Sequence, residues 1–96
     1  MNSKQRAFLK SQAQNLDSTL HVGKNGVTPE LVNSITQALD ARELLKISVL
    51  NNCEIDIEEV CTMISERTKS VPVQIIGKKI ILYKQPKKNA KIILPK

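Results

Sequence analysis

The sequence predicts an α/β chain of the α+β type, in which one mixed four-stranded sheet and its packed helices form two layers in the order αβαβαββ. Three observations predict this fold. Apolar residues recur at helical and at two-residue spacing in alternating segments, typical N-cap residues stand where the helical segments begin, and two β-branched runs near the end flank a glycine turn. Strands that alternate with helices favour right-handed crossovers, which place them in one sheet.

Length and composition indicate one domain, residues 1–96. A chain of 96 residues can bury one modest hydrophobic core. Its content of 41% hydrophobic and 25% charged residues is ordinary for a packed globular protein. Residues 85–96 are expected to form an extended basic tail that docks at its end, because Ile92-Ile93-Leu94 is too apolar for a flexible arm.

The first predicted helix covers residues 3–16. Ser3 is its candidate N-cap, and its apolar residues Leu9, Ala13 and Leu16 fall on one stripe. Its basic residues fall largely on the other side.

A short strand is predicted at residues 19–22, a run rich in β-formers that Gly23 ends. Thr28 and Pro29 are typical of an N-cap followed by a first-turn proline, so a second helix is expected over residues 29–41.

The second predicted strand follows this helix. Leu45, Ile47 and Val49 alternate with polar residues, which is the period of a half-buried strand, and Asn51-Asn52 ends it.

A third helix is predicted from Asp56 to about Lys69. Asp56 and Glu59 are spaced as in a capping box, and an apolar stripe follows them. Cys61 lies on that stripe, and we interpret it as a small core residue rather than a nucleophile.

A terminal antiparallel hairpin is predicted from the runs 71–76 and 79–84, with Gly77-Lys78 as a two-residue turn. Pro72 lacks a backbone donor, so its strand is expected to lie at an edge of the sheet or to begin there.

Charge is segregated along the chain. Residues 1–29 carry a net charge of +3, residues 30–66 carry −6 and residues 67–96 carry +9, which gives +6 overall. Such a chain can present one basic face, and this favours a polyanion such as nucleic acid as the partner. A generally solvated basic surface is the alternative interpretation.

No pattern in the sequence supports an enzyme, a metal site or a membrane protein. Cys53 and Cys61 form no CxxC pair, His21 is the only histidine, and no nucleophile motif, P-loop or paired-carboxylate pattern is present. The first ten residues lack an apolar stretch, and the longest apolar runs have four residues. We therefore expect a cytoplasmic location, with no cofactor, metal, membrane or small-molecule substrate.

The strongest candidate site is the loop Gly23-Lys24-Asn25-Gly26, followed by Thr28. Phosphate-binding loops need small residues for close backbone approach, free N–H groups, and preferably a helix N-terminus. Lys24 would add an ionic contact and Asn25 a hydrogen bond to sugar or base, so the loop would position a nucleotide backbone without reading its sequence.

A plain turn is the alternative, since Asn-Gly is a strong hairpin signal and a G-x-x-G string is weak evidence alone. A hairpin, however, requires a second strand after Gly26, and the sequence instead has a helix start there.

Five ordered segments resemble the CRM domain family, in its bacterial single-domain, YhbY-type form, over nearly the whole chain. They are Lys4-Gln5-Arg6 with Leu9-Lys10, Val22 to Thr28, Arg42 to Ile47, Val73 to Lys78 with Leu82-Tyr83, and Lys91 to Pro95.

The resemblance implies a domain similar to the C-terminal domain of a bacterial translation initiation factor. It also implies association with precursors of the large ribosomal subunit during ribosome assembly. The expected partner is thus structured ribosomal RNA or a pre-large-subunit particle, bound by a monomer. Leu20-His21-Val22 departs from the family pattern in detail, which leaves the role of His21 open.

Basic residues outside the loop complete the predicted RNA surface. With only Phe8 and Tyr83 as aromatic residues, base stacking has little support, and Tyr83 could either stack or fill the core. Solvating lysines on an edge strand are the alternative for each single residue. The candidates are Lys78, Lys79 and Lys84 in the hairpin, where Lys78 and Lys84 could flank one backbone track, and then Lys4, Arg6 and Lys10 in the first helix.

A protein-interaction module is the second functional hypothesis. In this case the basic face would bind an acidic ribosomal protein or assembly factor. The two hypotheses separate at the loop, because RNA binding should depend on Gly23 and Gly26 as well as on charge.

Overall fold

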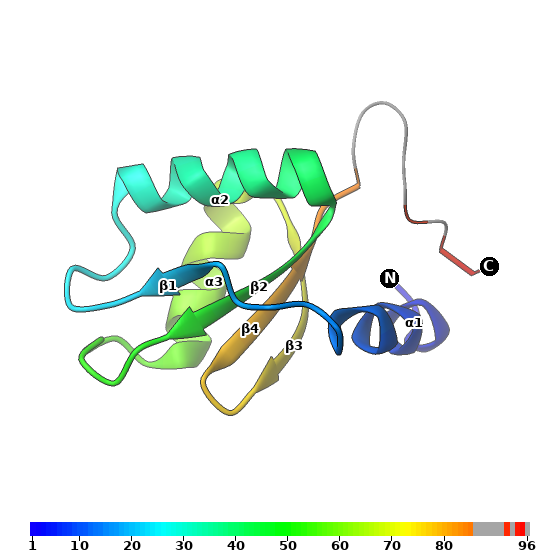
Figure 1. The fold of residues 1–96 in the computed structure, drawn as a ribbon, viewed down its shortest axis with the longest axis horizontal. Helices are drawn as coiled ribbons and strands as arrows, with labels where there is room; N and C mark the ends of the chain where they lie inside the picture. Colours follow the sequence, from blue (N-terminus) through cyan, green and yellow to red (C-terminus); the bar gives the residue numbers. More distant parts are fainter. Residues whose placement is uncertain (86–91, 93, 96) are drawn as a thin grey trace.

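The computed structural model describes residues 1–85, 92, 94 and 95, and its elements follow the predicted order (Figure 1). The predicted α+β class with a four-stranded mixed sheet is confirmed. The helices are α1 (Ser3–Ala13), α2 (Pro29–Arg42) and α3 (Ile57–Thr68), and the strands are β1 (Leu20–Val22), β2 (Leu44–Val49), β3 (Val71–Ile76) and β4 (Lys79–Tyr83).

The strands form one sheet in the order β1-β2-β4-β3. β1 runs parallel to β2, while β4 is antiparallel to both β2 and β3. β3 is thus an edge strand, and its pairing is irregular between Pro72 and Gln74. An edge strand with a bulge tolerates a residue without an N–H, so the predicted edge position of Pro72 is confirmed.

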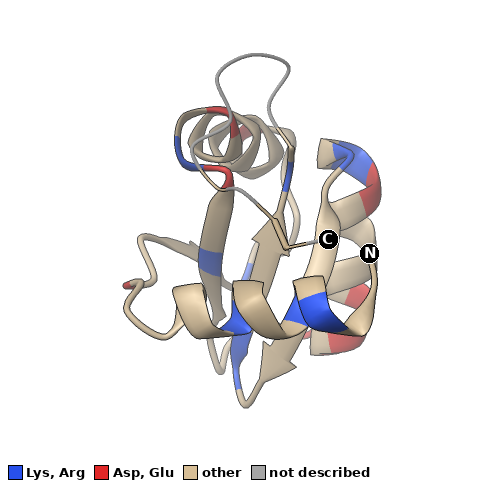
Figure 2. Cartoon of the chain, turned by 90° about the vertical axis from the view of Figure 1, so that its right-hand side faces the viewer, with Lys and Arg blue, Asp and Glu red and all other residues tan. Residues whose placement is uncertain are grey.

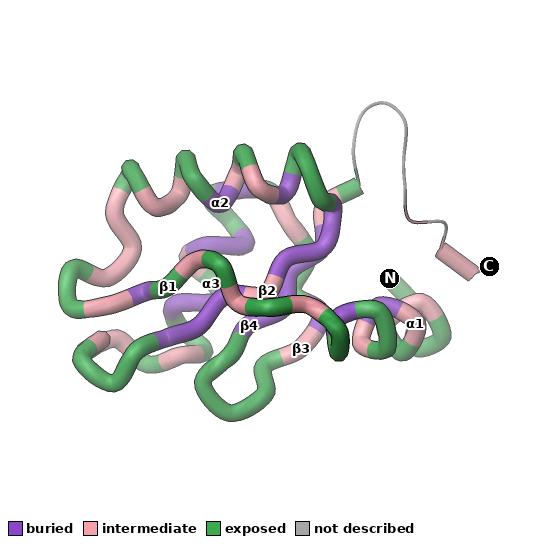
Figure 3. Tube along the Cα trace, viewed as in Figure 1, coloured by how far each residue is buried: buried purple, intermediate pink, exposed green. Residues whose placement is uncertain are grey.

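Helices lie on both faces of the sheet, so the molecule has three layers and the predicted two-layer arrangement is wrong. α2 and α3 cover one face, where Leu45 and Ile47 of β2 are buried with residues of both helices. α1 packs on the opposite face, where Leu44 and Tyr83 are buried beside Leu9. Burial is therefore concentrated along β2 and β4 (Figure 3). β2 was predicted to be half-buried. Its residue Leu44 is instead buried under α1, so β2 is buried on both faces.

The first helix begins and ends differently from the prediction. Its N-cap is Asn2, not Ser3, since the Asn2 side chain accepts the N–H of Gln5 at 2.8 Å and the Gln5 side chain accepts the N–H of Asn2 at 3.2 Å. This is a capping box that uses asparagine and glutamine. The helix stops at Ala13, and Leu16 reaches the α1-side core from the segment that follows.

The predicted start of α2 is confirmed, whereas the predicted capping box of α3 is not present. Thr28 caps α2 as predicted, because its Oγ1 accepts the N–H of Leu31 at 3.1 Å. Asp56 occupies the N-cap position of α3 without a side-chain capping bond, so the predicted capping box is wrong. Glu58 and Glu59 lie in the first turn, where the helix dipole favours acids.

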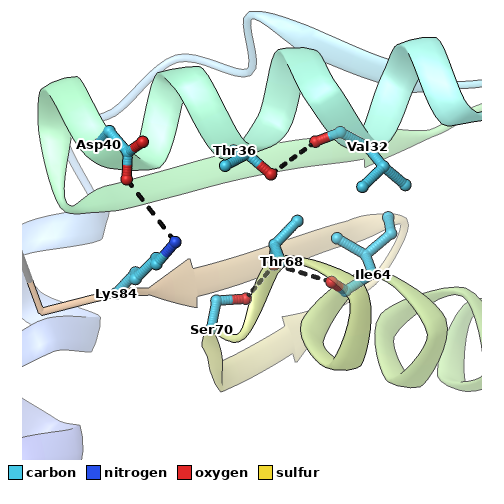
Figure 4. Close-up of polar contacts among 7 residues, drawn as sticks. All are labelled: Val32, Thr36, Asp40, Ile64, Thr68, Ser70 and Lys84. Carbon is cyan, nitrogen blue, oxygen red and sulfur yellow. Dashed lines mark hydrogen bonds and ion pairs between the residues drawn. The ribbon is translucent and has the colours of Figure 1, made fainter.

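The C-terminal end of α3 lies beside α2, where the chain turns into β3 (Figure 4). α3 ends at Lys69, the predicted end, in the left-handed conformation (φ 57°). The buried hydroxyl of Thr68 donates to the carbonyl of Ile64 at 2.8 Å and also hydrogen-bonds Ser70. These bonds satisfy a buried polar group at the point where the chain turns into β3.

Part of the predicted tail contacts the α1-side core. Ile92 and Leu94 pack against that core, and the N–H of Ile92 donates to the buried Glu43 carboxylate at 2.9 Å. Pro95 accepts a hydrogen bond from the Gln5 side chain at 3.1 Å. The tail lysines Lys87, Lys88 and Lys91 and the apolar Ile93 lie outside the described residues.

Candidate nucleic-acid interface

Residues 23–26 form a closed turn after β1. The N–H of Gly26 donates to the carbonyl of Gly23 at 3.0 Å, and Lys24 and Asn25 at the centre of the turn are exposed. The turn lies beside the segment that follows β2 (Figure 1), where Asn52 and Leu50 are the nearest neighbours of Gly23. The two polar side chains are thus presented to solvent by a rigid base.

The backbone conformation and the space around the turn favour glycine at only one of its two glycine positions. Gly26 has φ +67°, and a Cβ there would come within 3.1 Å of the Ile55 side chain, so the fold itself favours glycine. Gly23 is outside the left-handed region, and a Cβ would make ordinary contacts at 3.5 Å. The fold therefore does not require glycine at position 23.

The N-terminus of α2 offers fewer donors than the sequence suggested. Pro29 has no N–H, Leu31 donates to the Thr28 hydroxyl, and Val32 donates to the Thr28 carbonyl at 3.0 Å. The Glu30 carboxylate also lies in this turn. An anion at the loop would therefore depend mainly on Lys24, Asn25 and the turn amides rather than on the helix terminus.

Lys78 and Lys84 do not flank one track. Lys78 is exposed at the hairpin tip, whereas Lys84 follows the opposite end of β4. Lys84 lies 3.7 Å from the carboxylate of Asp40 on α2 (Figure 4), so a carboxylate already pairs with its charge. Of this pair, Lys78 is better placed to contact a polyanion.

Arg6 joins α1 to the sheet edge. Its guanidinium donates to the carbonyls of Pro72 and Val73, both at 2.8 Å, at the bulge of β3. These bonds occupy a group that the sequence assigned to RNA binding, and they fix the position of α1. Lys4, two residues earlier, is exposed.

A groove brings Lys10 and Lys79 together with Lys46, a residue that sequence reasoning did not select. Its volume is about 370 Å³, and it lies where α1 leaves the sheet uncovered. The alternation of β2 was the available signal, because Lys46 occupies a polar position between two core residues. The lining residues are Lys10, Ala13, Gln14, Lys46, Gln74, Ile76, Lys79 and Ile81.

Acidic residues are most frequent on α3, although its C-terminal end also carries Arg67 and Lys69. Figure 2 shows Lys and Arg on α1 and along the strands, while Asp and Glu are prominent on α3. Glu58, Glu59 and Glu66 belong to α3, which packs on the other side of the sheet from α1. A polyanion would thus meet the α1 side with the least repulsion.

Two residues left open by the sequence have clear places. Tyr83 is buried in the α1-side core, so it fills the core rather than stacking on bases. Burial, and to a lesser extent the Glu43 carboxylate, raises the pKa of its hydroxyl. Cys61 is buried as predicted, and burial raises the pKa of its thiol. His21 is exposed on the edge strand β1.

The part of the chain that the structure describes lacks two features. None of its helices is long and apolar enough to cross a membrane. In the same residues, no group of three or more His, Cys, Asp or Glu side chains is placed to hold a metal ion.

Comparison with known proteins identifies the family. A protein named "Probable RNA-binding protein YqeI" from Bacillus subtilis (strain 168) is 44% identical over 95 residues, covering 99% of both chains. An "RNA-binding protein" from Haemophilus influenzae is 34% identical over 96 residues, covering all of this chain and 96% of that one. Neither name is that of an enzyme, in agreement with the non-enzymatic class that the sequence predicted.

A solved structure shares the fold. The solution structure of the hypothetical protein SAV1595 from Staphylococcus aureus, described there as a candidate RNA-binding protein, superposes with a TM-score of 0.83 at 38% identity and 99% coverage of both chains. The family model of the CRS1 / YhbY (CRM) domain matches residues 1–84. The chain therefore belongs to the CRS1/YhbY (CRM) domain family, as the five sequence segments predicted.

Proposed function

We propose that this chain is an RNA-binding protein whose 23–26 loop contacts the RNA backbone and whose α1-side basic residues extend that contact. The observation that carries the proposal is Gly23: a glycine that the fold does not require stands next to an exposed lysine and asparagine. A missing side chain allows the closest approach of a sugar-phosphate backbone. The names of the two bacterial relatives support the same function.

The proposed contact is mainly electrostatic. No ion pair joins Lys24, Lys78 or Lys79 to a carboxylate among the described residues, whereas Lys84 is paired. Free cations of this kind neutralise phosphates and release counterions from the RNA. The acidic α3 would orient the protein with its α1 side toward the RNA.

The proposed target is ribosomal RNA in a precursor of the large subunit, and the proposed location is the cytoplasm. The extent of the resemblance to YhbY-type proteins supports this target. In a cell extract, the protein should sediment with large-subunit precursors, and Lys24→Gln should reduce that share. Sedimentation with mature particles or with no particle would contradict the ribosomal target while leaving RNA binding open.

A salt series tests the loop directly. Wild type, Gly23→Ala, Lys24→Gln and the control Lys69→Gln are compared on a structured ribosomal RNA fragment, with folding checked by circular dichroism. The control removes one exposed charge at the end of α3. Lys24→Gln should remove one phosphate contact, so the fall of log K with log salt should become less steep by about 0.7 to 0.9. The control should leave this slope unchanged.

Gly23→Ala should keep its thermal midpoint and bind more weakly at every salt concentration. Equal binding by all four proteins would make the loop purely structural. Binding of an acidic protein, with no binding of RNA, would favour the protein-interaction module.

A further inference from the structure

We propose that the groove between α1 and the open sheet binds one unpaired nucleotide, with adenine preferred, and that this subsite adds base recognition to the backbone contact of the loop. The inference rests on the proposed function, because it presumes that RNA is the partner. It concerns a different surface, formed by α1, β2, β3 and β4, and three kinds of lining residue support it.

The first support is charge. Lys10, Lys46 and Lys79 line the groove, and no acidic residue does. Lys79 donates to the hydroxyls of Ser18 and Ser48 at 3.2 and 2.9 Å, which fixes its ammonium group through neutral acceptors. Within the described chain none of the three lysines is in an ion pair with a carboxylate. The groove thus holds uncompensated positive charge for a phosphate.

The second support is an apolar floor. Ala13, Ile76 and Ile81 line the same groove, and Ile76 is 52% exposed. A flat base can lie against aliphatic side chains, which replaces the aromatic stacking that this chain cannot offer there. With Tyr83 and Ile81 in the core, the exposed side chain of Ile76 is the main surface on which a base could rest.

The third support is a pair of amides. Gln14 enters from α1 and Gln74 from β3, so they approach the floor from different elements. A glutamine side chain has both a donor and an acceptor, and it matches the N6 and N7 atoms of adenine. The amides alone do not separate adenine from uracil, because N3–H and O4 of uracil also pair with an amide; the larger two-ring base of adenine covers more of the apolar floor, and this favours adenine.

Size and position favour a single strand. A volume of about 370 Å³ is at the small end of ligand sites, about 300 to 1,000 Å³, so the groove fits a nucleotide rather than a duplex. Lys46 lies three residues before Val49, which pairs with Val22 at the start of the loop. That separation is about 10 Å along the strand, so one RNA segment could contact the loop and the groove together.

A nuclear magnetic resonance titration with short oligonucleotides tests the groove. Five-residue oligoadenylate and oligouridylate are added to wild type, Gln14→Ala/Gln74→Ala, Lys46→Gln and the control Lys69→Gln. The oligomers should shift the amide signals of Lys46, Gln74 and Ile76. Adenylate should bind more tightly than uridylate, because a purine buries more apolar surface against the floor of the groove.

The variants separate the two parts of the subsite. Gln14→Ala/Gln74→Ala should weaken both oligomers by about tenfold, because an amide pairing is lost, without changing the salt slope. Lys46→Gln should weaken both oligomers equally and lower the slope by about 0.7. Lys69→Gln should change neither quantity.

Three outcomes would overturn the inference. Shifts confined to residues 23–26, with structured RNA still bound in a Lys24-dependent way, would refute the groove and leave the proposed function intact. Absence of binding to any RNA would refute both. Groove shifts with polyglutamate, and none with oligonucleotide, would identify an acidic polypeptide as the occupant.

Discussion

The two faces of the sheet are covered to different extents. α2 and α3 enclose the face of Leu45, Ile47 and Leu82 within a continuous apolar core. α1 covers the opposite face only in part, so a smaller core around Leu9 gives way to the lysine-lined groove. The difference shows how a chain of 96 residues can be stable and still expose sheet residues to a partner: one face carries the stability and the other is shared with binding.

Core truncation should produce the largest effect and the clearest contrast between the faces. Leu82→Ala should lower the free energy of unfolding by about 4 kcal/mol, whereas Leu9→Ala should cost about 2 to 3 kcal/mol, because α1 can settle partly into the space. Both leucines are fully buried. Urea unfolding measures the difference, and a larger loss for Leu9→Ala would place the main stability on the α1 side.

The exposed part of the α1 face should respond differently. Ile76→Ala should change the free energy of unfolding by no more than about 0.5 kcal/mol, since exposed positions carry little stability. The same change should weaken oligonucleotide binding, because Ile76 is part of the groove floor. If Ile76→Ala lowers the free energy of unfolding by more than about 1 kcal/mol and the folded variant binds normally, the groove is a packing site.

The two helix starts on the α2/α3 face should contribute different, smaller amounts to the free energy of unfolding. Thr28→Ala should cost about 1 kcal/mol, because it removes a capping bond to Leu31. Asp56→Ala should cost clearly less in the same thermal unfolding experiment, since Asp56 makes no capping bond. Equal costs would indicate that Asp56 stabilises α3 through an interaction other than a cap.

Each face buries one group whose raised pKa lies in the alkaline range, and this predicts a modest alkaline destabilisation. The pKa of Cys61 on the α2/α3 side and that of Tyr83 on the α1 side are both raised, so the unfolded chain loses these protons at lower pH than the folded chain. Stability should therefore be unaffected by these groups below about pH 8 and fall as pH rises above about 8.5 to 10.

Single substitutions assign this alkaline loss to the two faces. Tyr83→Phe should remove the α1-side part, and Cys61→Ala should remove the other part at the cost of a small cavity. Denaturant unfolding at pH 7 and pH 10 measures both. A loss that persists unchanged in Tyr83→Phe would show that this hydroxyl does not contribute.

Local patterns predicted most of the elements and the position of the loop. The cap at Thr28, the alternation of β2 and the Gly77 turn depend on neighbouring residues, which the sequence displays directly. The cap of α1 was misplaced by one residue because Asn2 and Ser3 are both good capping residues, and only backbone geometry separates them.

The groove could not be predicted because it depends on contacts between distant segments. Lys46 lies opposite Ile81, and Ile81 opposite Gln74, only in the register of β2, β4 and β3. Lys10 joins them because Arg6 fixes α1 at the β3 bulge. Arg6 and Lys84 were assigned to RNA binding because their partners are also distant in sequence. Arg6 donates to carbonyls of β3, and Lys84 pairs with Asp40.

The most direct test of RNA binding through the loop and the groove is an amide shift map of the protein bound to a structured ribosomal RNA hairpin with an adenine-containing loop. This mode of binding predicts shifts at Lys24 and Asn25, continuing to Lys46 and Gln74, while the signals of α3 stay in place. Shifts that gather on α3, or a map without shifts under conditions where the protein is folded, would contradict it.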